Sequence, residues 1–270
     1  MKNKKLNQSN NSKNQLISIV IPLYNEAQNV KLISNALEEA LKDYKFEILL
    51  VNDGSTDETS HQLKKLNKKS TITIELDKNY GQSSALAAGI DFAKGNYIVT
   101  MDGDLQNDPM DIPWMLEIIK NEKLDLISGF RIDRKDSFLK KISSKIGNHI
   151  IQFITKTNIK DCGCALKIFN KNTAKTLTLS GEAHRYVTII SFLNGAKIKQ
   201  VPINHMPRKF GKSKYGLERV FKVIYDIILI SLKYNCSNRI FKSKQNNYSI
   251  KNIYGSSIEI KERNSIQFQT

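Results

Sequence analysis

Four short apolar runs, alternating with segments of helical periodicity, constrain the fold of this chain more than any other feature. Each run has the length and composition of a buried strand. Apolar residues recur every three or four positions between Val30 and Leu41, and small residues fill a second helical segment at 81–93. Strands that alternate with helices in this way predict an α/β fold with a doubly wound, mostly parallel central sheet. The four runs cover residues 16–23, 46–51, 72–76 and 97–101.

Polar, acidic clusters follow three of these runs. They contain Tyr24 with Glu26, then Asp53, then Asp102 with Asp104. Ligands of open parallel sheets bind beyond the carboxyl ends of the strands. One such cluster is compatible with a simple turn or a helix cap, whereas three together indicate a ligand site. The chain has no G-x-G-x-x-G and no G-x-x-x-x-G-K-[ST] motif, so dinucleotide and P-loop folds lose their main support.

The stretch at 96–109, N-Y-I-V-T-M-D-G-D-L-Q-N-D-P, carries the most informative cluster. Asp102 and Asp104 leave the end of a strand together, and their charges repel each other unless a cation lies nearby. A hard divalent ion suits this arrangement when one or two carboxylates and the phosphates of a ligand hold it. Gly103 lets the backbone approach a ligand closely, and Gln106 offers another oxygen. An Asx-type turn is the alternative. A calcium loop does not fit, because its required Gly and Glu are missing.

Charge divides the chain into two halves. Residues 1–130 carry 15 lysines, no arginine and 18 acidic residues, a net charge of −3, so residues 131–270 carry +19. The basic half therefore calls for an anionic partner or surface. The three cysteines have no zinc spacing and an odd count, which favours a reduced, cytoplasmic setting. The first 14 residues are polar and lysine-rich, which predicts a disordered basic arm and no signal peptide.

Four motifs give the chain a resemblance to a known family. S-I-V-I-P-L-Y-N-E, V-N-D-G-S-T-D-E-T, G-Q-S-S-A-L-A-A-G-I and M-D-G-D-L-Q resemble the nucleotide-sugar half of the family-2 glycosyltransferases, which have the GT-A fold. The similarity is greatest to the polyprenyl-phosphate glycosyltransferases, the group of the dolichol-phosphate mannose synthases, and covers residues 16–232. The resemblance implies inverting transfer of a sugar from a UDP or GDP donor to polyprenyl phosphate, for synthesis of cell-envelope glycans or glycoconjugates.

The resemblance also implies roles for individual residues of the first half. Asp102, Asp104 and Gln106 would hold Mg²⁺ or Mn²⁺ against the donor diphosphate. Asp104 is in addition a predicted catalytic residue, because the ion would stabilise the leaving nucleoside diphosphate. The residues that would bind the nucleotide are Pro22, Tyr24, Glu26, Asp53, Asp102, Arg208 and Lys214.

The second half carries the acceptor and membrane features. Residues 131–160 include eight basic and two acidic side chains, and apolar residues recur mainly every four positions in the middle of the segment. This pattern suits a surface helix packed on the sheet as well as an amphipathic helix in the headgroup layer of a membrane. By resemblance, Arg131 and Lys141 bind the acceptor phosphate. Arg131 and Asp161 are also predicted catalytic residues, with Asp161 acting as a base or only orienting other groups.

The predicted organisation ends in amphipathic, interfacial helices. The longest uncharged run after residue 216 is far shorter than the ~20 residues that a membrane span requires. We therefore expect a protein that lacks the C-terminal transmembrane helices of many relatives and lies peripherally on the cytoplasmic face of the cell membrane. Family members form dimers and tetramers, which leaves a homo-oligomer open. The predicted parts are a basic arm (1–14), a GT-A domain (15–215) with a nucleotide-sugar half (15–130) and an acceptor half (131–215), an amphipathic juxtamembrane helix (216–234) and a polar basic tail (235–270).

Three alternative functions remain open. A family-2 enzyme could transfer sugar to a glycan hydroxyl, although the basic R-K-F-G-K-S-K-Y-G loop and the absence of a Q-x-x-R-W block argue against it. A relative without catalytic activity could bind nucleotide sugars only. A nucleic-acid-binding protein would fit the net charge of +16. The acidic strand ends would repel a phosphate backbone, however, so we expect no nucleic acid among the partners.

Overall fold

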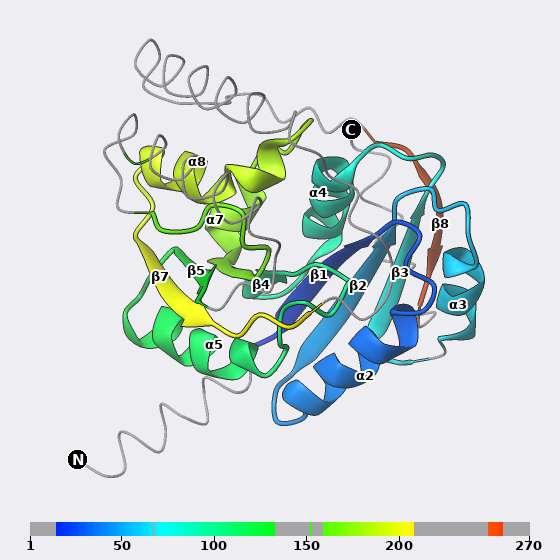
Figure 1. Cartoon of the computed structure of the whole chain (residues 1–270), viewed down its shortest axis with the longest axis horizontal. Helices are drawn as coiled ribbons and strands as arrows, with labels where there is room; N and C mark the ends of the chain where they lie inside the picture. The colour runs from blue at the N-terminus through cyan, green and yellow to red at the C-terminus, as the bar shows by residue number, and fades with distance from the viewer. Residues whose placement is uncertain (1–14, 67, 133–151, 153–158, 208–247, 256–270) are drawn as a thin grey trace.

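The computed structural model describes residues 15–66, 68–132, 152, 159–207 and 248–255 (Figure 1). The predicted arm at 1–14, most of the basic segment at 131–160 and the juxtamembrane helix at 216–234 lie outside these residues. Within the described part of the chain, no helix is both long and apolar enough to cross a bilayer.

Strands and helices alternate through the first half, as the apolar runs predict. The four runs correspond to the first four strands, whereas the helix Asp111–Asn121 and the later strands lie outside them. The strands are β1 (Ile17–Leu23), β2 (Phe46–Asn52), β3 (Thr71–Leu76), β4 (Tyr97–Thr100), β5 (Leu126–Arg131), β6 (Lys167–Asn170), β7 (Ile198–Ile203) and β8 (Ile250–Tyr254). The helices are α2 (Val30–Ala40), α3 (Thr59–Lys65), α4 (Gln82–Phe92), α5 (Asp111–Asn121), α7 (Lys171–Lys175), the 3-10 turn η1 (Ala183–Arg185) and α8 (Val187–Leu193).

The described strands form one sheet in the order β7-β5-β6-β4-β1-β2-β3-β8. β1 is parallel to β2 and β4, β2 to β3, and β5 to β7, which confirms the mostly parallel sheet. β6 runs antiparallel between β4 and β5. Its first residue, Lys167, therefore pairs with Thr100, the last residue of β4, and with Ser128, halfway along β5. This reversal brings residues 159–166 to the edge of the sheet where β4 and β5 end.

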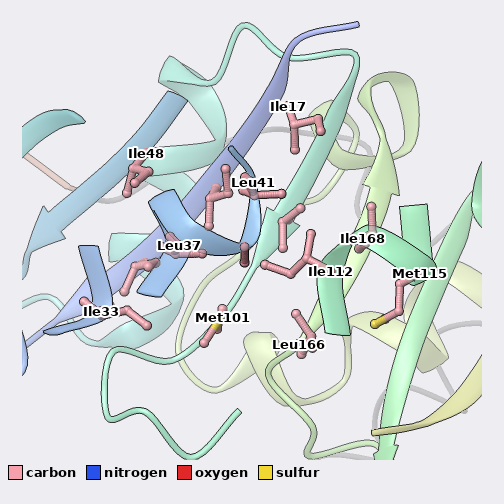
Figure 2. Packing of buried hydrophobic residues seen from close by; sticks show 14 of the residues in the cluster. Ile17, Ile33, Leu37, Leu41, Ile48, Met101, Ile112, Met115, Leu166 and Ile168 are labelled. Carbon is pink, nitrogen blue, oxygen red and sulfur yellow. The ribbon is translucent and has the colours of Figure 1, made fainter. Parts of the chain in front are cut away.

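Two hydrophobic cores lie on opposite faces of the sheet. Successive residues of a strand point to opposite faces, so Ile19 joins the core under α2 and α5 while Val20 joins the core under α4. Figure 1 shows α2 and α5 on one side and α4, α7 and α8 on the other. In the first core, Leu37 of α2 and Met115 of α5 are completely buried (Figure 2). Burial of each such side chain stabilises the fold by about 1.5–3 kcal/mol.

The predicted polar tail contributes the last strand. β8 pairs antiparallel with β3 at the edge of the sheet. The Tyr254 hydroxyl donates to a carboxylate oxygen of Glu75 over 3.0 Å, and the Tyr248 hydroxyl donates to Asp91 over 2.8 Å. The sequence from 235 onward shows no clear period, so neither this pairing nor its anchors could be predicted from it.

Candidate active site

The three predicted polar clusters meet at one edge of the sheet. Leu23 at the end of β1 pairs with Asn52 at the end of β2, and Val20 pairs with Thr100 at the end of β4. The loops that follow these strands therefore leave the same edge of the sheet. Asp53 and Asp104 are buried in this edge, with 3% and 5% of their surface exposed. The structure thus brings together the residues that the sequence singled out in its first half.

Hydrogen bonds join the loop after β1 to the loop after β2. Asn25 has a left-handed backbone (φ 56°), which lets its side chain accept from the Thr56 amide over 2.8 Å. Its own amide donates to the Ser55 hydroxyl over 2.9 Å, and the Glu26 amide donates to the Thr59 hydroxyl over 2.9 Å. The predicted nucleotide residues of this loop are thereby held in a fixed backbone. Pro22, Tyr24 and Glu26 are all half-buried.

Asp53 connects the end of β2 to the start of α4. Its carboxylate accepts from the backbone amides of Tyr80 (2.7 Å) and Gly81 (2.9 Å). Burial raises the pKa of Asp53, and these two amides act in the opposite direction. Gly54 (φ 63°) has no room for a side chain, since a Cβ would lie 2.3 Å from the carbonyl carbon of Lys78. Asp53 therefore has a structural role in addition to its predicted role in nucleotide binding.

The loop after β4 is fixed from two sides. Asp102 accepts from the Gln82 side chain at the start of α4 over 2.7 Å, and Asp104 accepts from the Gln106 amide over 3.1 Å. The Met206 amide, beyond β7, donates to the Gln106 carbonyl over 2.8 Å. An isolated bridge between residues 107 and 205 adds a second tie. Both aspartates are thus presented by a constrained loop rather than by a free turn.

Gly103 between the two aspartates is required for a reason other than the expected one. The sequence suggested that it lets the backbone approach a ligand. In the structure, a Cβ at this position would lie 2.4 Å from Cδ2 of Leu23. The close approach is therefore to β1, which lies beneath the loop.

The chemistry of this loop fits a divalent cation shared with a ligand. Asp102 and Asp104 supply carboxylate oxygens, and Gln106 follows them, although its side-chain nitrogen faces the Met206 carbonyl at 3.5 Å. Among the described residues, no group of three or more His, Cys, Asp or Glu side chains could hold a metal ion alone. Mg²⁺ and Mn²⁺ sites that depend on one or two carboxylates are completed by substrate phosphates.

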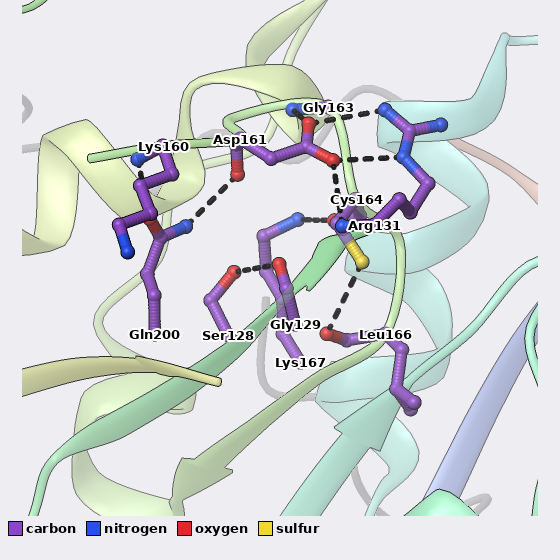
Figure 3. A network of polar contacts seen from close by, with 10 residues as sticks. All are labelled: Ser128, Gly129, Arg131, Lys160, Asp161, Gly163, Cys164, Leu166, Lys167 and Gln200. Atoms are coloured by element: carbon purple, nitrogen blue, oxygen red, sulfur yellow. Dashed lines mark hydrogen bonds and ion pairs between the residues drawn. The ribbon is translucent and has the colours of Figure 1, made fainter. Parts of the chain in front are cut away.

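Arg131 and Asp161 form a bidentate ion pair beside this loop (Figure 3). Arg131 Nε donates to Asp161 Oδ2 over 2.8 Å and Nη2 donates to Oδ1 over 3.0 Å. The amide of Gly163 also donates to Oδ1 over 3.0 Å. The two side chains are only 15% and 7% exposed. The sequence predicted a role for each residue but not their pairing, which uses two of the five guanidinium N–H donors.

Lys167 is a site residue that the sequence analysis missed. Its side chain is buried, and its ammonium donates to the Cys164 carbonyl (Figure 3). Burial lowers the pKa of Lys167, while the Asp161 and Asp102 carboxylates act against that effect. Its place at the start of an apolar strand gave no functional signal. Its position between Asp102 and Asp161 depends on the antiparallel pairing of β6 with β4 and β5, which the sequence alone does not reveal.

His184 and the two cysteines near Lys167 contribute to packing rather than to the chemistry of the site. His184 Nδ1 lies 2.8 Å from the Ser83 hydroxyl, and burial lowers the pKa of His184 to about 3. Cys162 and Cys164 are buried free thiols, and burial raises the pKa of each, to about 12 and about 11. Both cysteines therefore serve as packing residues. The other predicted site residues, Lys141, Arg208 and Lys214, lie outside the described residues.

Solved structures share this fold. Glucosyl-3-phosphoglycerate synthase from Mycobacterium tuberculosis, crystallised with Mn²⁺ and UDP-glucose, has a TM-score of 0.66 at 12% identity and covers 93% of this chain and 90% of its own. The same protein with Mn²⁺, UDP and glucosyl-3-phosphoglycerate has a TM-score of 0.65 at 14% identity, with coverage of 87% and 86%. At such low identity the likeness shows the GT-A fold alone.

One relative has a much higher sequence identity. Dodecaprenyl-phosphate galacturonate synthase from Rhizobium johnstonii is 40% identical over 222 residues, 79% of this chain. This chain spans 66% of the length of that relative. The family model of Glycosyl transferase family 2 matches residues 18–178, a range that contains both the D-G-D loop and the Arg131–Asp161 pair. The chain therefore belongs to glycosyl transferase family 2.

Proposed function

We propose that this protein is a metal-dependent glycosyltransferase that transfers a sugar from a nucleotide-sugar donor to a polyprenyl phosphate. Family membership supports the transfer reaction. The name of the relative from Rhizobium johnstonii supports a polyprenyl phosphate acceptor. The product would serve synthesis of a cell-envelope glycan or glycoconjugate.

One spatial observation carries this proposal. The acidic loop with Asp102 and Asp104 follows β4. Arg131 is the last residue of β5, and its partner Asp161 lies in the segment that precedes β6. Because β6 lies between β4 and β5, these two groups occupy neighbouring positions on one edge of the sheet. Such an edge can hold a donor diphosphate beside an acceptor phosphate.

The donor would lie over the loops after β1, β2 and β4. Pro22, Tyr24 and Glu26 would contact the base and ribose, and Asp53 would accept a hydrogen bond from the base. Uracil and guanine both carry suitable N–H groups, so UDP and GDP donors are both candidates. The Mycobacterium tuberculosis structures contain UDP and Mn²⁺, which makes UDP the first nucleotide to test.

Asp102, Asp104 and Gln106 would hold Mg²⁺ or Mn²⁺. When bound, the ion would offset the negative charge that develops on the departing diphosphate. The residues of the chain have a separate task, which is to keep the carboxylates in place. Gln82 does this for Asp102, and the Gln106 amide does it for Asp104. Arg208 and Lys214 would add cationic contacts to the diphosphate.

Arg131 would bind the acceptor phosphate together with Lys141. Asp161 fits the role of orienting the Arg131 guanidinium better than the role of a base, because both of its oxygens already accept N–H bonds. The acceptor needs no base: a phosphate monoester has its second pKa near ~6 and is mostly dianionic at neutral pH. The reaction would then be a single in-line displacement with inversion at the anomeric carbon.

We further propose that the protein works at the cytoplasmic face of the cell membrane as a peripheral protein. The charge of +19 in residues 131–270 supports this location, because each Lys or Arg near an anionic membrane surface contributes about 1 kcal/mol. A homo-oligomer remains a candidate assembly.

The decisive test is a transfer assay with radiolabelled UDP- and GDP-sugars, UDP-galacturonic acid included, and a polyprenyl phosphate. We expect labelled product in the organic phase. Asp104→Ala should lose metal-dependent donor binding and transfer, whereas Arg131→Ala should keep donor binding and lose transfer. Asp108→Ala, in the same loop, is the matched control and should retain both. Product only in the aqueous phase would favour a glycan or other soluble acceptor. Metal-dependent nucleotide binding with no transfer to any acceptor would favour a binding protein without catalytic activity.

A further inference from the structure

Lys167 occupies the centre of the edge that carries the proposed site. It is the first residue of β6, opposite Thr100 of β4 and Ser128 of β5. Asp102 follows Thr100 by two residues, and Arg131 follows Ser128 by three. The register therefore places Lys167 between the acidic loop and the Arg131–Asp161 pair. Only 3% of its surface is exposed.

Two carboxylates lie near the Lys167 ammonium. Its charge interacts with both Asp161 and Asp102. Its ammonium donates a hydrogen bond to the Cys164 carbonyl, which fixes the side chain next to the Arg131–Asp161 pair (Figure 3). His184 lies close enough for the lysine charge to help lower the pKa of the imidazole. Lys167 thus places one positive charge near the Asp102 and Asp161 carboxylates, and this charge weakens their attraction for a metal ion.

Charge balance at this edge is close to neutral. The three carboxylates of Asp102, Asp104 and Asp161 stand against the guanidinium of Arg131 and the ammonium of Lys167, which leaves one net negative charge. Such a site attracts a free divalent cation weakly. A nucleoside diphosphate would add two or three negative charges as well as oxygen ligands, and the same ammonium would attract it.

We propose that the buried ammonium of Lys167 makes metal binding depend on the nucleotide. In this view, Lys167 is a positioning residue that acts through Asp102 and Asp161 and touches no substrate. It weakens the binding of a free divalent ion and strengthens the binding of the diphosphate, so that the ion and the nucleotide bind together. The inference rests on the proposed function and assigns a role to a residue outside the predicted metal, nucleotide and acceptor sets.

A purely structural role makes a different prediction. If Lys167 only satisfied the Cys164 carbonyl, any uncharged donor would replace it without an effect on ion affinity. Lys167→Gln keeps an N–H donor and removes the charge, so it separates the two roles. Lys175→Met is the matched control, because the Lys175 ammonium also donates to backbone carbonyls, those of Ile90 (2.5 Å) and Asp91 (2.8 Å), away from the acidic loop.

The experiment is a titration of the full chain with Mn²⁺, followed by electron paramagnetic resonance of the free ion, with and without UDP or GDP. The wild-type protein should bind Mn²⁺ at least about tenfold more tightly when the nucleotide is present. Without nucleotide, Lys167→Gln should bind Mn²⁺ about tenfold more tightly than wild type, because the variant removes a unit positive charge near the ion site. The same variant should bind UDP or GDP more weakly without metal. Lys175→Met should match wild type in all three measurements.

Two results would overturn the inference while leaving the proposed function intact. One is a Lys167→Gln protein whose affinity for free Mn²⁺ is unchanged or lower. The other is a wild-type protein that binds Mn²⁺ equally well with and without nucleotide, a result that needs no folded variant. If neither nucleotide bound with or without Mn²⁺, the proposed function itself would fail.

Discussion

The Arg131–Asp161 pair offers the most quantitative test of the site. Arg131→Met removes the guanidinium and leaves a carboxylate that is 7% exposed, to which the backbone amides of residues 131 and 163 still donate. Breaking a buried ion pair by removing one partner costs about 3–5 kcal/mol, mainly because the remaining charge stays desolvated. Since 15% of the arginine side chain is exposed, we expect the lower end of this range, about 3 kcal/mol.

A double-mutant cycle isolates the interaction between the two side chains. Asp161→Asn should also destabilise the protein, but the double variant Arg131→Met/Asp161→Asn leaves neither charge of the pair buried without its partner. Its loss of unfolding free energy should therefore be smaller than the sum of the two single losses by about 2 kcal/mol. Urea unfolding followed by circular dichroism gives the four free energies. The exposed pair of Lys42 and Glu39, with side chains 64% and 69% exposed, is the control, and Lys42→Met should leave stability unchanged.

Additivity would refute this account of the pair. If the two single losses add within about 0.5 kcal/mol, the side chains do not stabilise each other. Asp161 would then not orient Arg131, and the assignment of Asp161 as an orienting residue would be wrong.

Three further predictions concern residues that support the site. First, His184 is neutral in the fold with a pKa of about 3, against 6.5 in the unfolded chain, so stability should fall as the pH drops below 6.5. By about pH 5 the loss should reach about 2 kcal/mol in urea unfolding, and His184→Gln should show less of this dependence. Second, Gly103→Ala should cost about 1–3 kcal/mol through overpacking against Leu23, and the double variant Gly103→Ala/Leu23→Ala should lose less stability in urea unfolding than the sum of the two single losses. Third, Asp53→Asn should cost about 1–3 kcal/mol, because an amide offers only one acceptor oxygen to the two backbone amides before α4. An unchanged melting temperature would contradict the anchoring role of Asp53.

The sequence predicted the part of the fold that depends on local pattern. Apolar runs and helical periodicity are short-range features, so β1, β2, β3 and β4 and the helix α4 lie within one or two residues of their predicted bounds. The meeting of the acidic clusters at one edge followed from a general rule of parallel sheets. The shared location of Asp53, Asp102 and Asp104 was therefore predictable from the sequence.

The parts that escaped prediction depend on long-range pairing. The insertion of β6 between β4 and β5 brings Asp161 to Arg131, 30 residues earlier in the chain, and turns Lys167 into a site residue. Neither consequence appears in a local pattern. The same holds for β8, whose pairing with β3 spans more than 170 residues and is supported by the Tyr254–Glu75 bond. Gly103 was predicted as a constrained position, but its neighbour Leu23 became apparent only from the packing of β4 on β1.

The central claim is that Asp102 and Asp104 share a divalent cation with the diphosphate of a sugar nucleotide. A crystal structure of the full chain grown with Mn²⁺ and UDP or GDP tests it most directly, because manganese can be located by its anomalous scattering. The account predicts one anomalous peak in contact with oxygens of both aspartates and of the diphosphate. A diphosphate bound at another edge of the sheet, with no peak at these two aspartates, would contradict it.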